Sequence, residues 1–197
     1  MGRLARFIHF FAGETKPELP KEYLRLGGFS MDDNCYWVIE GFKLQGTDTL
    51  RFSFSVNVAC NVLGCYTNTS AQTNYSLYVG TTASSKYLRY NGGTYSSWVV
   101  AKTKYDVAIT PTGSKGMEEE STWTQKDFTA PVDFCIGTTS TGATSAKLKG
   151  SLYGNIVVDG RAKLIPCKRK SDGALGYYDT YTKTFYAPAT GTPTPLD

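Results

Sequence analysis

The stretch that decides the fold is residues 50–58, which read LRFSFSVNV. Apolar side chains occupy every second position, and polar or charged side chains occupy the positions between them. Successive side chains of an extended chain point to opposite faces of a sheet, so one face carries Leu50, Phe52, Phe54, Val56 and Val58. The segment therefore predicts an antiparallel strand with one face in the core and the other in water.

Similar short segments recur on both sides of this stretch. We expect further strands at residues 36–41, 75–79, 87–90, 98–100, 106–110, 134–137, 147–158, 163–167 and 175–178. Turn residues separate them, and the Asp-Gly pairs at 159–160 and 172–173 are typical of hairpins. The pattern predicts an all-β protein, a two-sheet antiparallel sandwich of the jelly-roll kind.

Two regions depart from this pattern. Helix is expected only near the N-terminus and at residues 115–121. Residues 187–197 contain three prolines and are expected to be irregular.

Composition agrees with this fold and excludes several functions. The 197 residues include 14 Tyr, 10 Phe and 20 Gly, and only 19% are charged. The single histidine, His9, rules out a zinc site with several histidines and leaves little for a Ser-His-Asp triad. A net charge of +4 is too small to predict nucleic-acid binding, and no phosphate-binding loop is present, so no cofactor is expected.

The five cysteines are Cys35, Cys60, Cys65, Cys135 and Cys167. Their number is odd and no C-x-x-C pair occurs, so neither a structural zinc site nor a full disulfide framework is expected. Most have apolar neighbours, which favours buried thiols and a reducing compartment. A single Cys60–Cys65 bridge remains open as an alternative.

Residues 1–21 differ from the rest and are interpreted as an N-terminal anchoring arm and linker. Apolar residues at helical spacing, followed by Pro17 and Pro20, predict an arm that binds a partner or folds back on its own domain. Its candidate partner-binding residues are Leu4, Phe7, Ile8, Phe10 and Phe11. The apolar run is too short for a signal peptide or a membrane span, so no membrane association is expected.

Three polar groupings could carry chemistry, and each has a simpler explanation. Glu118, Glu119 and Glu120 could supply the two carboxylates of a glycosidase, although a solvated loop explains them better. Residues 32–34 could offer oxygen ligands to Ca2+ but lack the spacing of a calcium loop, so no metal is expected. The cations Arg161, Lys163, Lys168, Arg169 and Lys170 could bind an anionic polymer or protect an edge strand from aggregation.

Aromatic residues are the stronger indication of binding. Five of them crowd residues 177–186, and Trp98 and Trp123 lie beside predicted loops. An exposed ring offers apolar area and a polar handle, which suits stacking on a sugar, although most such rings fill a core. The candidate glycan-binding residues are Trp98, Trp123, Tyr178 and Tyr181.

The C-terminal half carries a family resemblance. Residues 164–171 read LIPCKRKS, residues 172–186 read DGALGYYDTYTKTFY, and residues 22–26 read EYLRL. This text resembles the concanavalin A-like, LamG-type jelly-roll domains of phage and prophage structural proteins. The resemblance covers roughly residues 22–195. It implies one jelly-roll domain at residues 22–197, without catalytic residues, cofactor or metal.

The resemblance also implies a function. We expect a non-enzymatic virion protein of the capsid-decoration or tail-fibre type, assembled in the bacterial cytoplasm. Its arm would bind other virion proteins, and its jelly roll would bind cell-surface or mucosal glycans for host attachment. Homo-oligomer formation on the particle is compatible with this expectation. The alternatives are a free bacterial carbohydrate-binding module and a glycoside hydrolase that uses Glu118 or Glu120.

Overall fold

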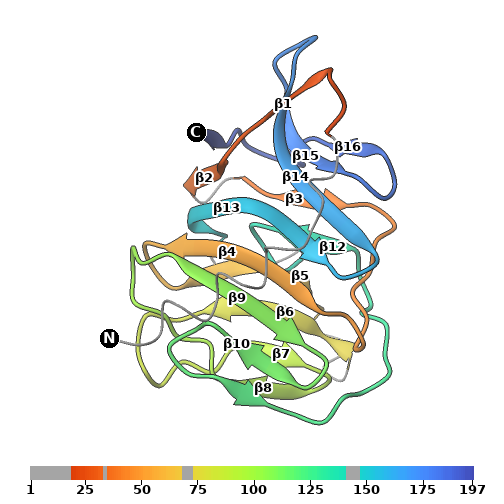
Figure 1. The fold of residues 1–197 in the computed structure, drawn as a ribbon. Helices are drawn as coiled ribbons and strands as arrows, with labels where there is room; N and C mark the ends of the chain where they lie inside the picture. The colour runs from red at the N-terminus through yellow and green to blue at the C-terminus, as the bar shows by residue number, and fades with distance from the viewer. Residues whose placement is uncertain (1–18, 33–34, 68–72, 141–146) are drawn as a thin grey trace.

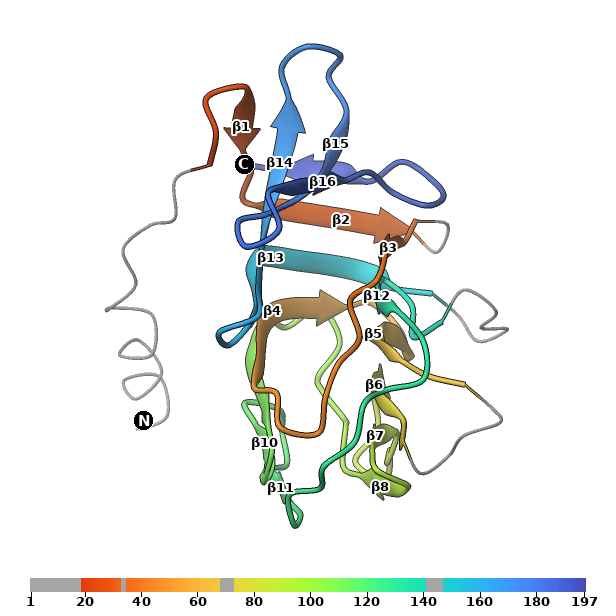
Figure 2. The same ribbon diagram turned by 90° about the vertical axis from the view of Figure 1, so that its right-hand side faces the viewer.

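The computed structural model describes residues 19–32, 35–67, 73–140 and 147–197. These residues form two antiparallel sheets and no helix, so the prediction of an all-β sandwich is confirmed. Figure 2 shows the sheets as two layers, with β4 (Leu50–Val56) and β10 (Gly113–Lys115) in one layer and β6 (Tyr75–Val79) to β8 (Gly93–Tyr95) in the other. No helix among the described residues is long and apolar enough to cross a membrane.

The larger sheet has eleven strands, and eight of them follow one path. In spatial order these are β11 (Ser121–Thr122), β10, β9 (Tyr105–Thr110), β4, β13 (Lys149–Val158), β14 (Ala162–Arg169), β15 (Leu175–Asp179) and β16 (Thr184–Tyr186). The remaining three are β1 (Tyr23–Arg25), β2 (Gly28–Asp32) and β17 (Thr194–Leu196). The sheet branches at β13, because β2 pairs with its first half and β14 with its last three residues.

The smaller sheet has six strands. Their order is β3 (Trp37–Ile39), β12 (Phe134–Ile136), β5 (Cys60–Cys65), β6, β7 (Leu88–Tyr90) and β8. Figure 1 places β14 and β15 at one end of the molecule and β7 and β8 at the other.

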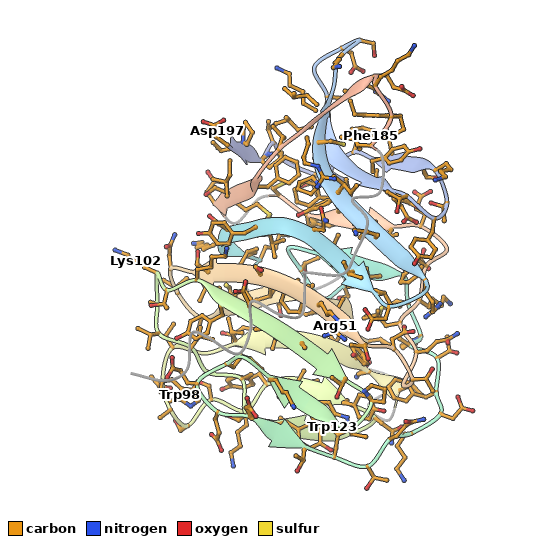
Figure 3. The ribbon with its side chains drawn as sticks, viewed as in Figure 1. Arg51, Trp98, Lys102, Trp123, Phe185 and Asp197 are labelled. Atoms are coloured by element: carbon orange, nitrogen blue, oxygen red, sulfur yellow. The ribbon has the colours of Figure 1, made fainter. Side chains whose placement is uncertain are left out.

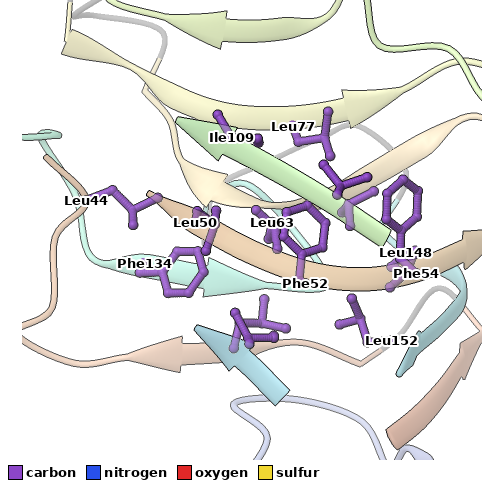
Figure 4. Packing of buried hydrophobic residues seen from close by; sticks show 14 of the residues in the cluster. Leu44, Leu50, Phe52, Phe54, Leu63, Leu77, Ile109, Phe134, Leu148 and Leu152 are labelled. Atoms are coloured by element: carbon purple, nitrogen blue, oxygen red, sulfur yellow. The ribbon is translucent and has the colours of Figure 1, made fainter. Parts of the chain in front are cut away.

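The core lies between the sheets and follows the alternation seen in the sequence. Leu50, Phe52 and Phe54 of β4 are almost completely buried, and Figure 4 shows them in the same cluster as Leu63 and Leu77 of the smaller sheet. The prediction for Val58 is wrong. This residue follows the end of β4 and is 46% exposed.

Most predicted strands are present, and both Asp-Gly turns join strands as expected. Gly160 and Gly173 have φ values of +71° and +75°, which glycine adopts without a steric penalty. Residues 98–100 do not form a strand, because Trp98 makes only an isolated bridge to Gly80. The helix predicted for residues 115–121 is also wrong, since β10 ends at Lys115 and β11 begins at Ser121.

The predicted irregular tail contains a strand. Within residues 187–197, β17 pairs antiparallel with β2, joining Thr194 to Ser30 and Leu196 to Gly28. Pro195 is compatible with this strand because β17 pairs with β2 on one side only. An edge strand tolerates a missing N–H on its unpaired side.

All five cysteines are free and buried, so a Cys60–Cys65 disulfide is wrong for this structure. Burial raises the pKa of Cys35, Cys65, Cys135 and Cys167 to about 12. The thiols therefore stay protonated at neutral pH and pack as small apolar side chains.

Candidate functional site

The outer face of the smaller sheet displays tyrosines. In β6, Tyr75 and Leu77 point into the core, so Tyr78 points to the opposite face. In and before β7, Leu88 and Tyr90 are buried, so Tyr87 and Arg89 point outward as well. We call the group formed by Tyr66, Tyr78, Tyr87 and Arg89 the tyrosine face.

Ring contacts order these side chains. The rings of Tyr78 and Tyr87 meet edge to face, with centroids 4.9 Å apart and planes at 74°. Tyr87 is nevertheless 47% exposed, so a large part of its ring is open to a ligand. Arg89 reaches from the middle of the face toward its other end, where its guanidinium lies 4.9 Å from the ring centroid of Tyr66. Both arrangements are favourable for aromatic rings.

Small side chains flank Arg89 in the middle of the face. Cross-strand register places Gly64, Ser76 and Arg89 in one row, and Thr94 of β8 continues this row. Gly64 has φ of +146°, and a Cβ there would lie 2.5 Å from the Cα of Ser76. Tyr66 and Tyr78 lie two residues from this row on opposite sides, roughly 13 Å apart along the strands. That separation suits a short oligosaccharide.

A bulge in β5 places a buried polar side chain opposite Tyr78. The register shifts between Asn61 and Leu63, and Asn61 pairs with Tyr78. Its Oδ1 accepts a hydrogen bond from Thr139 Oγ1 at 3.3 Å. Asn61 is only 3% exposed, so its carboxamide supports the strand beside Tyr78 from within and does not meet a ligand.

Trp98 is the one predicted glycan-binding residue at this face. Its backbone bridges Gly80, which follows Tyr78 by two residues, and its side chain is half-buried. The neighbouring Ser97 Oγ accepts a hydrogen bond from the backbone N–H of Tyr87 at 2.8 Å. These contacts place Trp98 at the Tyr78–Tyr87 end of the face.

The other three predicted residues lie elsewhere. Trp123 is half-buried and packs on Tyr90, with centroids 4.9 Å apart, and Figure 3 shows it well separated from Trp98. Tyr178 is only 6% exposed and lies against Tyr23, so its prediction as an exposed stacking ring is wrong. Tyr181 is 54% exposed, but it lies in the turn after β15, at the opposite end of the molecule from β7.

The basic residues singled out in the sequence have separate structural roles. Arg161 pairs with Asp48, Lys163 is buried, and Arg169 forms two hydrogen bonds with Asp172. Those hydrogen bonds from Arg169 lower the pKa of Asp172 to about 2. Edge protection does not explain Lys168 and Arg169, because at their level β14 lies between β1 and β15.

The carboxylates considered for glycosidase chemistry hold neighbouring segments in place. Glu118 accepts a hydrogen bond from Tyr105 Oη, which also accepts one from the backbone N–H of Val100 at 2.9 Å. Burial, followed by the hydrogen bond to Glu118, raises the pKa of Tyr105 to about 12. Glu119 accepts a hydrogen bond from Ser96 Oγ at 2.8 Å, and Glu120 is exposed.

Several predicted residues lie outside the described part of the chain. These are Asp33 and Asn34 of the calcium candidate and the arm residues Leu4, Phe7, Ile8, Phe10 and Phe11. Within the described ranges, no group of three His, Cys, Asp or Glu side chains could hold a metal ion.

Comparison of the chain with models of protein families, with curated proteins and with solved structures gave no match. The site is therefore defined by its own geometry. Sequence reasoning missed Tyr66, Tyr78, Tyr87 and Arg89. The last three could have been found, because inward-facing and outward-facing side chains alternate in residues 75–79 and 87–90, and the outward positions include an aromatic or charged residue.

Proposed function

We propose that the protein is a non-enzymatic glycan-binding β-sandwich of jelly-roll topology that a phage particle carries as a structural or decoration protein. The tyrosine face is the observation that carries the binding proposal. It combines three tyrosine rings for stacking with a guanidinium and phenolic hydroxyls that can hydrogen-bond to sugar hydroxyls. This combination suits carbohydrate better than an apolar ligand, because polar groups lie beside the rings.

Two sequence features support the virion part of the proposal. The text of residues 22–195 resembles phage LamG-type domains, and residues 1–21 carry the apolar arm expected to bind another virion protein. A protein on the outside of a phage particle would meet cell-surface or mucosal glycans, which are therefore the expected ligands.

Removing the rings is expected to abolish most of the binding. The double variant Tyr78→Ala/Tyr87→Ala should lower affinity for the best glycan of an array at least tenfold, since each stacking ring contributes about 1 kcal/mol. Isothermal titration with that glycan measures the change. Tyr181→Ala is the matched control, because it removes an equally exposed tyrosine at the opposite end of the molecule.

The thermal transition of each variant separates lost binding from lost folding. Unchanged affinity in a folded double variant would refute the tyrosine face as the site. An array without any bound glycan would refute the binding function itself.

The arm is tested by truncation. A chain without residues 1–18 is expected to be absent from purified phage particles, whereas its thermal transition should stay within a few degrees of the full chain. Immunoblotting of particles from a deletion phage complemented with each form gives the readout. Incorporation of the truncated chain would refute the anchoring role. Glycan binding without incorporation of either form would favour a free carbohydrate-binding module.

A further inference from the structure

We propose that the tyrosine face selects an acidic saccharide and that Arg89 binds the carboxylate of its sugar acid. This inference rests on the proposed glycan-binding function and adds the chemical class of the ligand. It is carried by the placement of Arg89 and by the lack of Asp and Glu in the four strands that form this part of the smaller sheet, β5 to β8.

Arg89 is held at the centre of the face. Its guanidinium lies over the ring of Tyr66, and cross-strand pairing places it between Ser76 and Thr94. A guanidinium held against a ring keeps N–H groups that can donate hydrogen bonds to a ligand. Thr94 is exposed and adds a hydroxyl on one side, whereas Ser76 is only 3% exposed. A carboxylate matches this fork, since two parallel N–H···O bonds fit its two oxygens.

The strands around Arg89 contain no acidic residue. Residues 49–105 contain neither Asp nor Glu, and strands β5 to β8 all belong to this stretch. Three of the other four arginines in the described part of the chain pair with aspartates, namely Arg51 with Asp159, Arg161 with Asp48 and Arg169 with Asp172, while Arg25 hydrogen-bonds Asn155. Arg89 has no such ion pair among the described residues, so a ligand anion can supply its counter-charge.

One guanidinium favours a carboxylate over a polyphosphate. A polymer with a phosphate in every repeat is bound by several cations in a row, but Arg89 is the one charged residue of strands β5, β6, β7 and β8, and Lys86 before β7 is the other cation nearby in the chain. The rings of Tyr78 and Tyr87 are then free to stack on neighbouring sugars of the same chain. A uronic or sialic acid within an otherwise neutral glycan fits this arrangement.

A matched ligand pair tests the inference. The probes are sialylated oligosaccharides and hyaluronan, in which neutral sugars alternate with the acid, each compared with its carboxyl-reduced form, in which the acid is converted to an alcohol. We expect at least one acidic form to bind tenfold or more tightly than its reduced form. This preference should shrink when the NaCl concentration is raised tenfold, because salt screens exposed charges.

Variants of Arg89 test whether this residue causes the preference for the acidic form of the glycan. Arg89→Met keeps an unbranched stem over Tyr66 but removes the charge, and it should bind the acidic and reduced forms equally. Arg89→Lys keeps the charge without the fork and should retain only part of the preference. Arg25→Met is the matched control, since Arg25 lies on β1 of the other sheet and hydrogen-bonds Asn155.

The outcomes separate this inference from the proposed function. Equal binding of acidic and reduced forms, with loss of both in Tyr78→Ala/Tyr87→Ala, would overturn the role of Arg89 and keep the glycan site. Retention of the preference in Arg89→Met would overturn the inference too, as would tighter binding of wall teichoic acid or of a DNA oligonucleotide. Failure of every acidic and neutral glycan to bind would overturn the proposed function itself.

Discussion

Replacing Gly28 with alanine is expected to lower the free energy of unfolding by about 3 kcal/mol or more. A Cβ at this position would lie 2.0 Å from the carbonyl oxygen of Leu152 and 2.9 Å from the Cα of Tyr153. Both obstacles are backbone, which cannot rotate away as a side chain would. The φ of Gly28 is +151°, which alanine rarely adopts.

The position of Gly28 in the sheet prevents an easy adjustment. The chain leaves β14 at the end of β1 and pairs with β13 from Gly28 onward. On the other side of β2, Leu196 pairs with Gly28, and the N–H of Gly27 donates to the Leu196 carbonyl at 2.7 Å. A shift of β2 away from β13 would therefore also disturb β17.

Urea denaturation measures the loss, and Gly154→Ala is the control. Gly154 also has a positive φ, +61°, but a Cβ there would meet no atom within 4 Å. Its replacement should cost only about 1 kcal/mol from backbone strain. Equal losses in the two variants would show that the approach of β2 to Leu152 is not what constrains Gly28.

Asp48→Ala is expected to lower the free energy of unfolding by about 2–3 kcal/mol. Asp48 is 4% exposed, and its carboxylate accepts hydrogen bonds from Arg161 at 2.6 Å and from the N–H of Gln45 at 2.7 Å. Removing one partner of a buried pair leaves the other charge poorly solvated. The estimate lies below that for a fully buried pair because the Arg161 side chain is 31% exposed.

The loss should extend beyond the ion pair. Arg161 also donates to the carbonyl of Lys43 at 3.1 Å and lies over the ring of Phe42, so it connects the segment before β4 to the β13–β14 turn. The buried Tyr75 hydroxyl donates to the Asp48 carbonyl at 3.4 Å, which links this segment to β6 below the tyrosine face.

Asp159→Ala is the matched control for Asp48→Ala. Asp159 pairs with Arg51 at 3.0 Å, but their side chains are 43% and 25% exposed. Such a pair contributes less than about 1 kcal/mol, because solvent screens it. Urea denaturation of both variants decides the point. A loss in Asp159→Ala as large as that in Asp48→Ala would contradict the role assigned to burial.

Alternation made much of the fold predictable. The inward positions of residues 50–56 and the Asp-Gly hairpins at 159–160 and 172–173 follow from local steric rules, and the structure confirms them. Prediction failed at β17, which contains Pro195. Local sequence describes this segment as irregular, and only its pairing with β2 makes it a strand.

The candidate site was less predictable than the fold. Trp98 was predicted from the sequence and lies beside Gly80 near the Tyr78–Tyr87 pair, where its binding role stays a prediction. Tyr178 was predicted to be exposed and is covered by Tyr23, a residue far away in the chain. The tyrosine face joins Tyr66, which follows β5, to Arg89 of β7, and the contact exists because β6 lies between these strands.

By itself, the sequence determined that this protein is all-β, which side chains of its longest strands are buried, and that no acidic residue occurs between Asp48 and Asp106. Only the tertiary structure decided which outward residues meet, namely that Arg89 lies over Tyr66 and that Tyr87 lies against Tyr78. The reason is physical. Alternation is imposed by the geometry of each extended residue, whereas neighbours across a sheet depend on pairing between strands that are distant in sequence.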